Sequence, residues 1–221
     1  MSRSWRAGLE LAAVGGAAAL FLCLLPRRPM ALDAGLALLA AALGIWHARR
    51  TDRAASAEPA APPPAGRAWG QVLVGTVAGL VVFGAVGGLD AWRATGQADA
   101  VAGRLLVPSL PVALVLFVPW AWLQQALLQR WVLGRLRAWL PQAPAPALAA
   151  LAGTAFGLVH LPAVDLAVVT TVGGAAWAWF YLRDRRLAPL ALSHALLGPA
   201  YFYWVRGEDL AGRWLTRLLS G

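Results

Sequence analysis

Long apolar runs separated by short polar segments dominate the pattern along this 221-residue chain. About seven of these runs approach or exceed the roughly 18 residues that a helix needs to cross about 30 Å of hydrocarbon. The pattern therefore predicts an all-α, polytopic integral membrane protein with about seven transmembrane helices. The predicted spans lie at roughly 7–25, 30–47, 69–89, 105–137, 145–161, 163–182 and 187–205.

The fourth run is long and is interrupted by Pro108, Pro111 and Pro119. Proline suits the first turn of a helix, because its missing N–H would be unpaired there anyway. We therefore expect the membrane helix of this run to begin near Pro119. The alternative is one kinked helix that contains this proline.

Three parts are predicted along the chain. Residues 1–104 hold N-terminal membrane helices and a linker at 48–67, whose Ala- and Pro-rich composition indicates an exposed, flexible segment. Residues 105–205 form the core that carries the unusual polar residues described below. Residues 206–221 form an amphipathic tail of the kind that lies on a membrane surface.

Composition agrees with a membrane protein and restricts its partners. Hydrophobic residues make up 60% of the chain and charged residues 13%, whereas a soluble domain is about one quarter charged. All 19 basic residues are Arg, and Lys and Asn are absent, which indicates a GC-rich, bacterial genome. The arginines lie between apolar runs and not on one basic face, so no nucleic-acid partner is expected. Cys23 is the only cysteine, which excludes an intrachain disulfide.

The arginines also predict an orientation. With the N-terminus inside, twelve arginines fall in cytoplasmic segments and seven outside. Arg-rich loops stay cytoplasmic, so we expect a multi-pass protein of the inner (plasma) membrane with a cytoplasmic N-terminus and membrane lipid as its surroundings.

Three short stretches place polar groups inside the predicted spans, where each such group needs a partner or a purpose. Gln125 and Gln129 are four residues apart and share a helix face, as do Phe156 and His160. His47 lies at a span end and is interpreted as an interfacial residue. The three stretches are QQALLQR (124–130), FGLVH (156–160) and LSHALLG (192–198).

Depth along the helices indicates whether these stretches meet. At about 1.5 Å rise per residue, Gln124 and His160 lie roughly 20 Å from the same membrane face. His194 is only about seven residues into its span, so its depth agrees less well. We expect convergence of the glutamines and both histidines; the alternative is that each amide or imidazole simply hydrogen-bonds between helices, at about 0.6 to 2 kcal/mol per bond.

In this order, the three stretches resemble the CPBP intramembrane proteases, which include the type II CAAX prenyl endopeptidases and bacteriocin-immunity-type membrane proteins. The family pattern is Glu-Glu-x-x-x-Arg, then Phe-x-x-x-His, then His-x-x-x-Asn. The resemblance covers residues 105–205 and implies an intramembrane peptidase core acting on membrane-embedded or lipidated peptide substrates. It assigns catalytic positions to Gln124, Gln125, His160 and His194, and supporting positions to Phe156, Gln129, Arg130 and Ser193.

The departures from the family pattern bear on activity. Gln124 and Gln125 stand where the family has glutamates, Gln129 stands at the arginine position with Arg130 displaced by one, and Gly198 replaces Asn. An amide has no ionisable group near neutral pH and cannot serve as a general base. If a divalent metal such as zinc binds, the resemblance places it on His160 and His194, but without an anionic ligand it would bind weakly.

Two functions follow. The first is an intramembrane endopeptidase that uses another carboxylate or its histidines. Glu10 and Asp165 are the nearby acidic candidates, although Glu10 can reach the interface and Asp165 can cap the next helix. The alternative is an inactive binding, immunity or scaffold protein. An unrelated carrier is disfavoured, because the chain lacks clear repeats and paired discontinuous helices.

Overall fold

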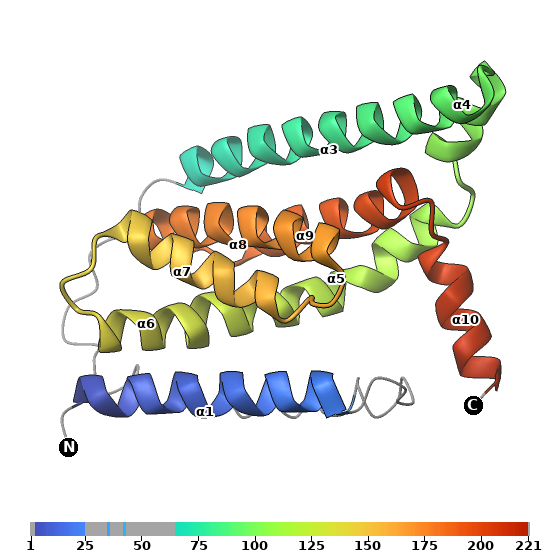
Figure 1. Cartoon of the computed structure of the whole chain (residues 1–221). Coiled ribbons are helices and arrows are strands. Elements are labelled where there is room, and N and C mark those ends of the chain that lie inside the picture. The colour runs from blue at the N-terminus through green and yellow to red at the C-terminus, as the bar shows by residue number, and fades with distance from the viewer. Residues whose placement is uncertain (1–2, 25–34, 36–41, 43–64, 221) are drawn as a thin grey trace. The chain divides into compact units, whose positions relative to one another are not determined.

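The computed structural model describes residues 3–24, 35, 42 and 65–220, and its elements over these residues are helices joined by short turns (Figure 1). The predicted span at 30–47, most of the 48–67 linker and His47 lie outside the described residues. In chain order the elements are α1 (Arg3–Leu24), α3 (Ala65–Thr95), α4 (Ala98–Leu105), α5 (Leu110–Ala126), the π-helix η1 (Leu127–Val132), α6 (Leu133–Trp139), α7 (Ala145–Leu158), α8 (Val164–Asp184), α9 (Ala188–Ala200), the π-helix η2 (Tyr201–Val205) and α10 (Leu210–Ser220).

The all-α membrane architecture is confirmed. In the described part of the chain, three stretches are long and apolar enough to cross a bilayer: Trp69–Thr95, Ala98–Trp139 and Val164–Asp184. Their mean hydropathies are 2.2, 2.1 and 1.2. Ala145–Leu158 is apolar but shorter. The total of about seven spans stays a prediction.

The helices form two compact units. Of the described residues, those at 3–24, 35, 42 and 123–187 make up the first unit, which holds α1, η1, α6, α7 and α8. Residues 64–122 and 188–221 make up the second, which holds α3, α4, most of α5, α9, η2 and α10. The three-part division predicted from the sequence stays a prediction.

The expected start of the fourth helix near Pro119 is wrong. The helix α5 begins at Leu110 and runs through Pro119, which is the alternative that the sequence left open. Pro111, not Pro119, occupies its first turn, where the missing N–H costs nothing. Within a membrane helix an internal proline is tolerated, because neighbouring groups satisfy the freed carbonyl.

In the first unit, two glycines bring α7 against α8. Gly153 and Gly157 form a Gly-x-x-x-Gly pair, a spacing that lets helix backbones approach closely in membranes. A Cβ placed on Gly153 would lie 2.5 Å from the backbone N of Ala175, and one on Gly157 would lie 2.6 Å from the carbonyl O of Ala167. This contact fixes the end of α7, where His160 follows.

The helix α1 packs against α6 through a charged pair. A guanidinium nitrogen of Arg135 lies 2.8 Å from a carboxylate oxygen of Glu10, with the Arg135 side chain 13% exposed. The indole of Trp139 covers Gly8, where an added Cβ would lie 2.8 Å from its nitrogen. Glu10 therefore pairs with Arg135 on a neighbouring helix. The interpretation of Glu10 as a group that reaches the interface did not predict this ion pair.

In the second unit, α3 packs on α9 and η2. A Cβ on Gly79 would lie 2.8 Å from the Leu197 side chain, and one on Gly87 would meet the backbone of Trp204. The buried hydroxyl of Thr76 donates a hydrogen bond of 2.8 Å to the hydroxyl of Ser193. These contacts hold α9, and with it His194, on α3.

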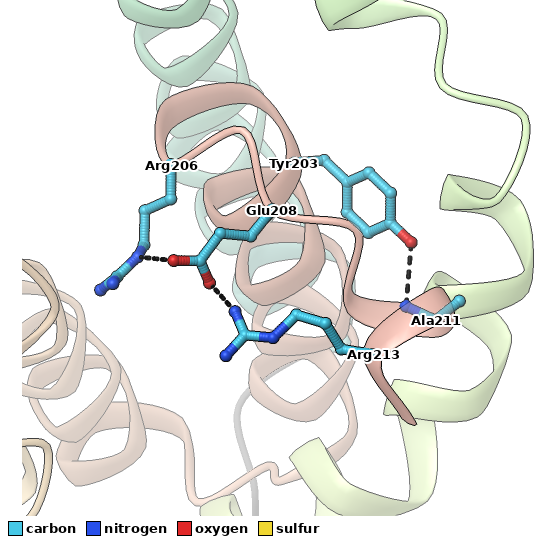
Figure 2. Close-up of polar contacts among 5 residues, drawn as sticks. All are labelled: Tyr203, Arg206, Glu208, Ala211 and Arg213. Atoms are coloured by element: carbon cyan, nitrogen blue, oxygen red, sulfur yellow. Dashed lines mark hydrogen bonds and ion pairs between the residues drawn. The ribbon is translucent and has the colours of Figure 1, made fainter. Parts of the chain in front are cut away.

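The predicted tail forms the helix α10, and its first turn is capped. The Oδ1 atom of Asp209 accepts a hydrogen bond of 2.9 Å from the N–H of Gly212, which is the pattern of an N-cap. The hydroxyl of Tyr203 donates to the same oxygen at 2.7 Å and accepts a bond of 3.1 Å from the N–H of Ala211 (Figure 2). The cap therefore ties α10 to η2.

We expect this cap to give α10 a defined pH dependence. The N–H of Gly212, followed by the Tyr203 hydroxyl, lowers the pKa of Asp209. A lowered carboxyl pKa stabilises the folded form above the unfolded value of about 3.9 and loses this effect as the pH falls through the folded value. The protection of the amides of residues 210–216, measured as their exchange rate relative to an unfolded chain at the same pH, should therefore stay constant from pH 8 to 5 and fall only in stronger acid.

The matching variant is Asp209→Ala, which removes the cap at every pH. It should raise the exchange of these amides by an amount equal to about 0.5–2 kcal/mol at neutral pH. Asp99→Ala, in the first turn of α4, is the control and should leave α10 unchanged. Exchange that is equal in Asp209→Ala and the unmodified protein would contradict the role of the cap.

Candidate active site

The glutamines of the first stretch form a buried amide pair. Gln125 is fully buried and Gln129 is 1% exposed. The Nε2 atom of Gln129 donates a hydrogen bond of 2.9 Å to Oε1 of Gln125. Within the described residues, Nε2 of Gln125, Oε1 of Gln129 and Oε1 of Gln124 are buried without a hydrogen-bond partner. The pair thus keeps a donor and an acceptor unused in an apolar setting.

The backbone changes its winding at this pair. The π-helix η1 begins at Leu127 and includes Gln129 and Arg130. Such single-turn π segments occur often at functional sites. Arg130 is exposed, whereas Gln129 is buried. The arginine displaced by one position therefore does not share the buried face of the amides.

His160 lies just beyond the end of α7. Its Nδ1 is 2.7 Å from the carbonyl O of Phe156. Because a carbonyl only accepts, Nδ1 carries the proton in this contact, and Nε2 of the neutral ring presents a lone pair. The ring centroids of Phe156 and His160 are 5.0 Å apart, edge to face, so the predicted packing of this pair is confirmed. Trp177 of α8 packs on the other side of Phe156, at 6.3 Å.

His194 and Ser193 belong to the second unit, where both are buried. The ring of Phe117 lies edge to face with His194, at 5.6 Å between centroids. The Ser193 hydroxyl is bonded to Thr76. Sequence reasoning missed Thr76 and Phe117, because single residues within apolar runs carry no motif. The convergence of His194 with the amides stays a prediction, since each unit is described by itself.

The acidic candidates do not offer a free carboxylate in the site. Glu10 forms the ion pair with Arg135. Asp165 is exposed in the first turn of α8, whose N-cap residue is Ala163, so the expected capping by Asp165 is wrong. The physical reason is its position, since Asp165 lies two residues inside the cap, within the helix itself. Of the two acidic candidates, Glu10 is thus paired with Arg135 and Asp165 is exposed in the first turn of α8.

The site residues fit a catalytic zinc poorly. Within the described residues, no group of three or more His, Cys, Asp or Glu side chains is placed to hold a metal. Zinc in enzymes takes His, Cys and carboxylate ligands, whereas the buried polar side chains of the first stretch, Gln125 and Gln129, are amides.

We therefore expect the purified protein to carry well under one equivalent of zinc by elemental mass spectrometry. Neutral imidazoles and amides provide no anionic ligand, so binding should be weak. His160→Ala is the comparison, because its Nε2 is the strongest neutral ligand at the described site. One full equivalent that disappears in His160→Ala would contradict this expectation.

Comparison with known proteins agrees with this geometry. Residues 106–198 match the model of a family described as type II CAAX prenyl endopeptidase Rce1-like. This match, over less than half of the chain, supports the resemblance of residues 106–198 to the CPBP family. The matched segment includes all three polar stretches, and it falls within the core predicted at 105–205. No curated protein and no solved structure matches the chain. The segment that carries the three polar stretches is thus similar to a family that is described by an endopeptidase activity.

Proposed function

We propose that this CPBP-family protein binds membrane-associated peptide segments and hydrolyses them far more slowly than a member with glutamates would. The observation that carries the proposal is the buried Gln125–Gln129 pair at the family's glutamate and arginine positions. Hydrolysis needs a base that takes a proton from water, and an amide cannot take it near neutral pH. The same amides are good hydrogen-bonding groups.

The unused atoms of the pair complement a peptide group. A peptide group offers one N–H and one C=O, and the pair has Nε2–H of Gln125 and Oε1 of Gln129 without a hydrogen bond. Both side chains are buried, so a bound peptide reaches these atoms only by displacing the side chains that cover them. The side-chain amides can also both be turned over, which reverses donor and acceptor and leaves the same two functions unused. In a low-dielectric site such unpaired groups are costly, so a ligand that satisfies them gains affinity.

The proposed ligands are peptides in or on the bilayer, including lipidated ones, and bilayer lipid surrounds the protein. The family description supports a prenylated CAAX-type peptide as the first probe. The arginine distribution supports an inner-membrane location with the N-terminus in the cytoplasm.

A second candidate function is slow peptidase activity with His160 as the base. The observation that favours it is the hydrogen bond from Nδ1 to the Phe156 carbonyl, because this bond leaves Nε2 as a proton acceptor. Under this alternative, His160→Ala abolishes the residual cleavage and leaves peptide binding in place.

The binding test uses liposomes that contain the full-length protein and a fluorescent, prenylated CAAX peptide. Gln125→Leu/Gln129→Leu removes both partners of the buried bond together, so its effect on folding should be small. Loss of two hydrogen bonds to the peptide should weaken its affinity by about tenfold or more. Gln142→Leu, at an exposed amide in the loop after α6, is the control. Unchanged affinity in the double-Leu protein would refute the proposed role of the pair.

A further inference from the structure

A line of aromatic rings joins the C-terminal helix to the second histidine. Phe117 of α5 lies edge to face with His194 of α9, at 5.6 Å and 77°. Its ring also stacks nearly parallel with Trp214 of α10, at 6.4 Å and 6°. Edge-to-face and offset-stacked pairs are the favoured aromatic arrangements. Phe117 therefore contacts one ring of α9 and one ring of α10, and both belong to the second unit.

The glycine at position 198 makes room for this ring. A Cβ placed on Gly198 would lie 2.6 Å from Cε1 and 2.9 Å from Cζ of Phe117. Real carbon atoms do not approach that closely, so any larger residue at 198 has to displace the Phe117 ring. Because His194 and Trp214 both contact the Phe117 ring, a displacement of this ring changes its contacts with them. The Phe117 ring thus occupies space that is open only because residue 198 has no side chain.

The start of α10 is held independently of Trp214. Asp209 caps the helix, and the Ser109 hydroxyl, just before α5, donates to the same carboxylate oxygen at 3.0 Å. Glu208 accepts from Nε of Arg206 at 3.0 Å and pairs on its other side with Arg213 (Figure 2). These contacts fix the first turn of α10 on α5 and η2, which places Trp214, one turn further, over Phe117.

We propose that Phe117 is a positioning residue that orients the ring of His194, and that α10 holds Phe117 in place through Trp214. The functional importance of His194 is what the family resemblance implies, whereas the peptide binding proposed above is carried by Gln125 and Gln129. The structural part of the proposal stands on the ring contacts alone. It gives the C-terminal helix a second role besides membrane association, because loss of its docking releases the histidine.

The proposal also explains the departure at position 198. The family has Asn there, and the resemblance gives that residue a place in the site. In this chain the space beside Gly198 is filled by Phe117. Gly198→Asn alone should therefore displace Phe117, and the change should be tolerated only together with Phe117→Ala.

The test is nuclear magnetic resonance of the full-length protein in nanodiscs, with its histidines isotopically labelled. Trp214→Leu changes a residue whose ring packs on Phe117, not on His194. We expect the His194 ring signals to move by more than their line width. Trp214→Phe keeps an aromatic ring over Phe117 and should restore most of the original position. The control is Trp92→Leu, at a half-exposed tryptophan of α3 in the same unit, which should leave His194 unchanged.

An unchanged His194 signal in Trp214→Leu would overturn the positioning role. If Trp214→Leu fails to fold, Phe117→Leu provides the same comparison, because it removes the ring that touches His194. Peptide affinity of the same samples separates the two proposals. A shifted His194 signal with unchanged peptide binding supports the positioning contact and shows that peptide binding does not depend on the His194 ring.

Discussion

Replacing Gln124 and Gln125 with glutamate should raise peptidase activity by about 10²- to 10⁴-fold. This is the range that a positioned general base contributes to a rate, and the present amides cannot supply it. The change is small in volume, and Nε2 of Gln129 can still donate to a carboxylate at position 125 as it does to the amide. Cleavage of a fluorescence-quenched, membrane-inserted peptide in liposomes measures the gain.

Two further variants locate the source of that gain. His160→Ala, added to the double-Glu protein, should abolish it, because the imidazole is expected to act beside the new carboxylate. Gln142→Glu adds a carboxylate at an exposed loop position and should give no activity. A double-Glu protein that folds, binds the peptide and stays inert would contradict the assignment of positions 124 and 125 to the catalytic glutamates. Gln129 and Gly198, which the resemblance aligns with Arg and Asn, would then be changed next.

Gly157→Ala should destabilise the protein strongly, although it adds only one methyl group. This methyl would meet the carbonyl of Ala167 and the side chain of Thr171 in α8, and a backbone carbonyl cannot move aside as a flexible side chain can. Overpacking of this kind costs about 1–3 kcal/mol and occasionally more. A lower midpoint of thermal unfolding in detergent, with loss of the Phe156–His160 packing, is the expected observation.

Gly134→Ala is the matched control. Gly134 lies in α6, and nothing lies within 4 Å of a Cβ placed there. Alanine is the better helix former by about 1 kcal/mol, so this variant should be as stable as the unmodified protein or more so. Equal stability of the Gly157→Ala and Gly134→Ala proteins would mean that α7 and α8 do not pack as closely as described.

Local patterns were sufficient to predict much of the core. Length and apolarity predicted α7 and α8 to within a few residues, because each lies between short polar or proline-containing turns. The spacing of four between Gln125 and Gln129 predicted a shared face, and the hydrogen bond between them follows from it. The same reasoning held for Phe156 and His160.

Contacts between distant segments could not be predicted in this way. The partner of Glu10 is Arg135, which lies far along the chain, and no local pattern joins them. Phe117 lies within an apolar run, and no local pattern indicates its contacts with His194 of α9 and Trp214 of α10. The start of α5 was misjudged because three prolines each suit a first turn, and only packing decides which of them is used.

The most direct test of slow hydrolysis by this protein is whether a bound peptide stays intact. The unmodified protein is saturated with prenylated CAAX peptide in liposomes, incubated and extracted, and the peptide is then analysed by mass spectrometry. We expect the peptide to be recovered intact. The amount of cleavage fragments should be at least about 100-fold smaller than the amount formed by the double-Glu protein. Rapid conversion to two fragments, at a rate that Gln124→Ala and Gln125→Ala leave unchanged, would contradict this expectation.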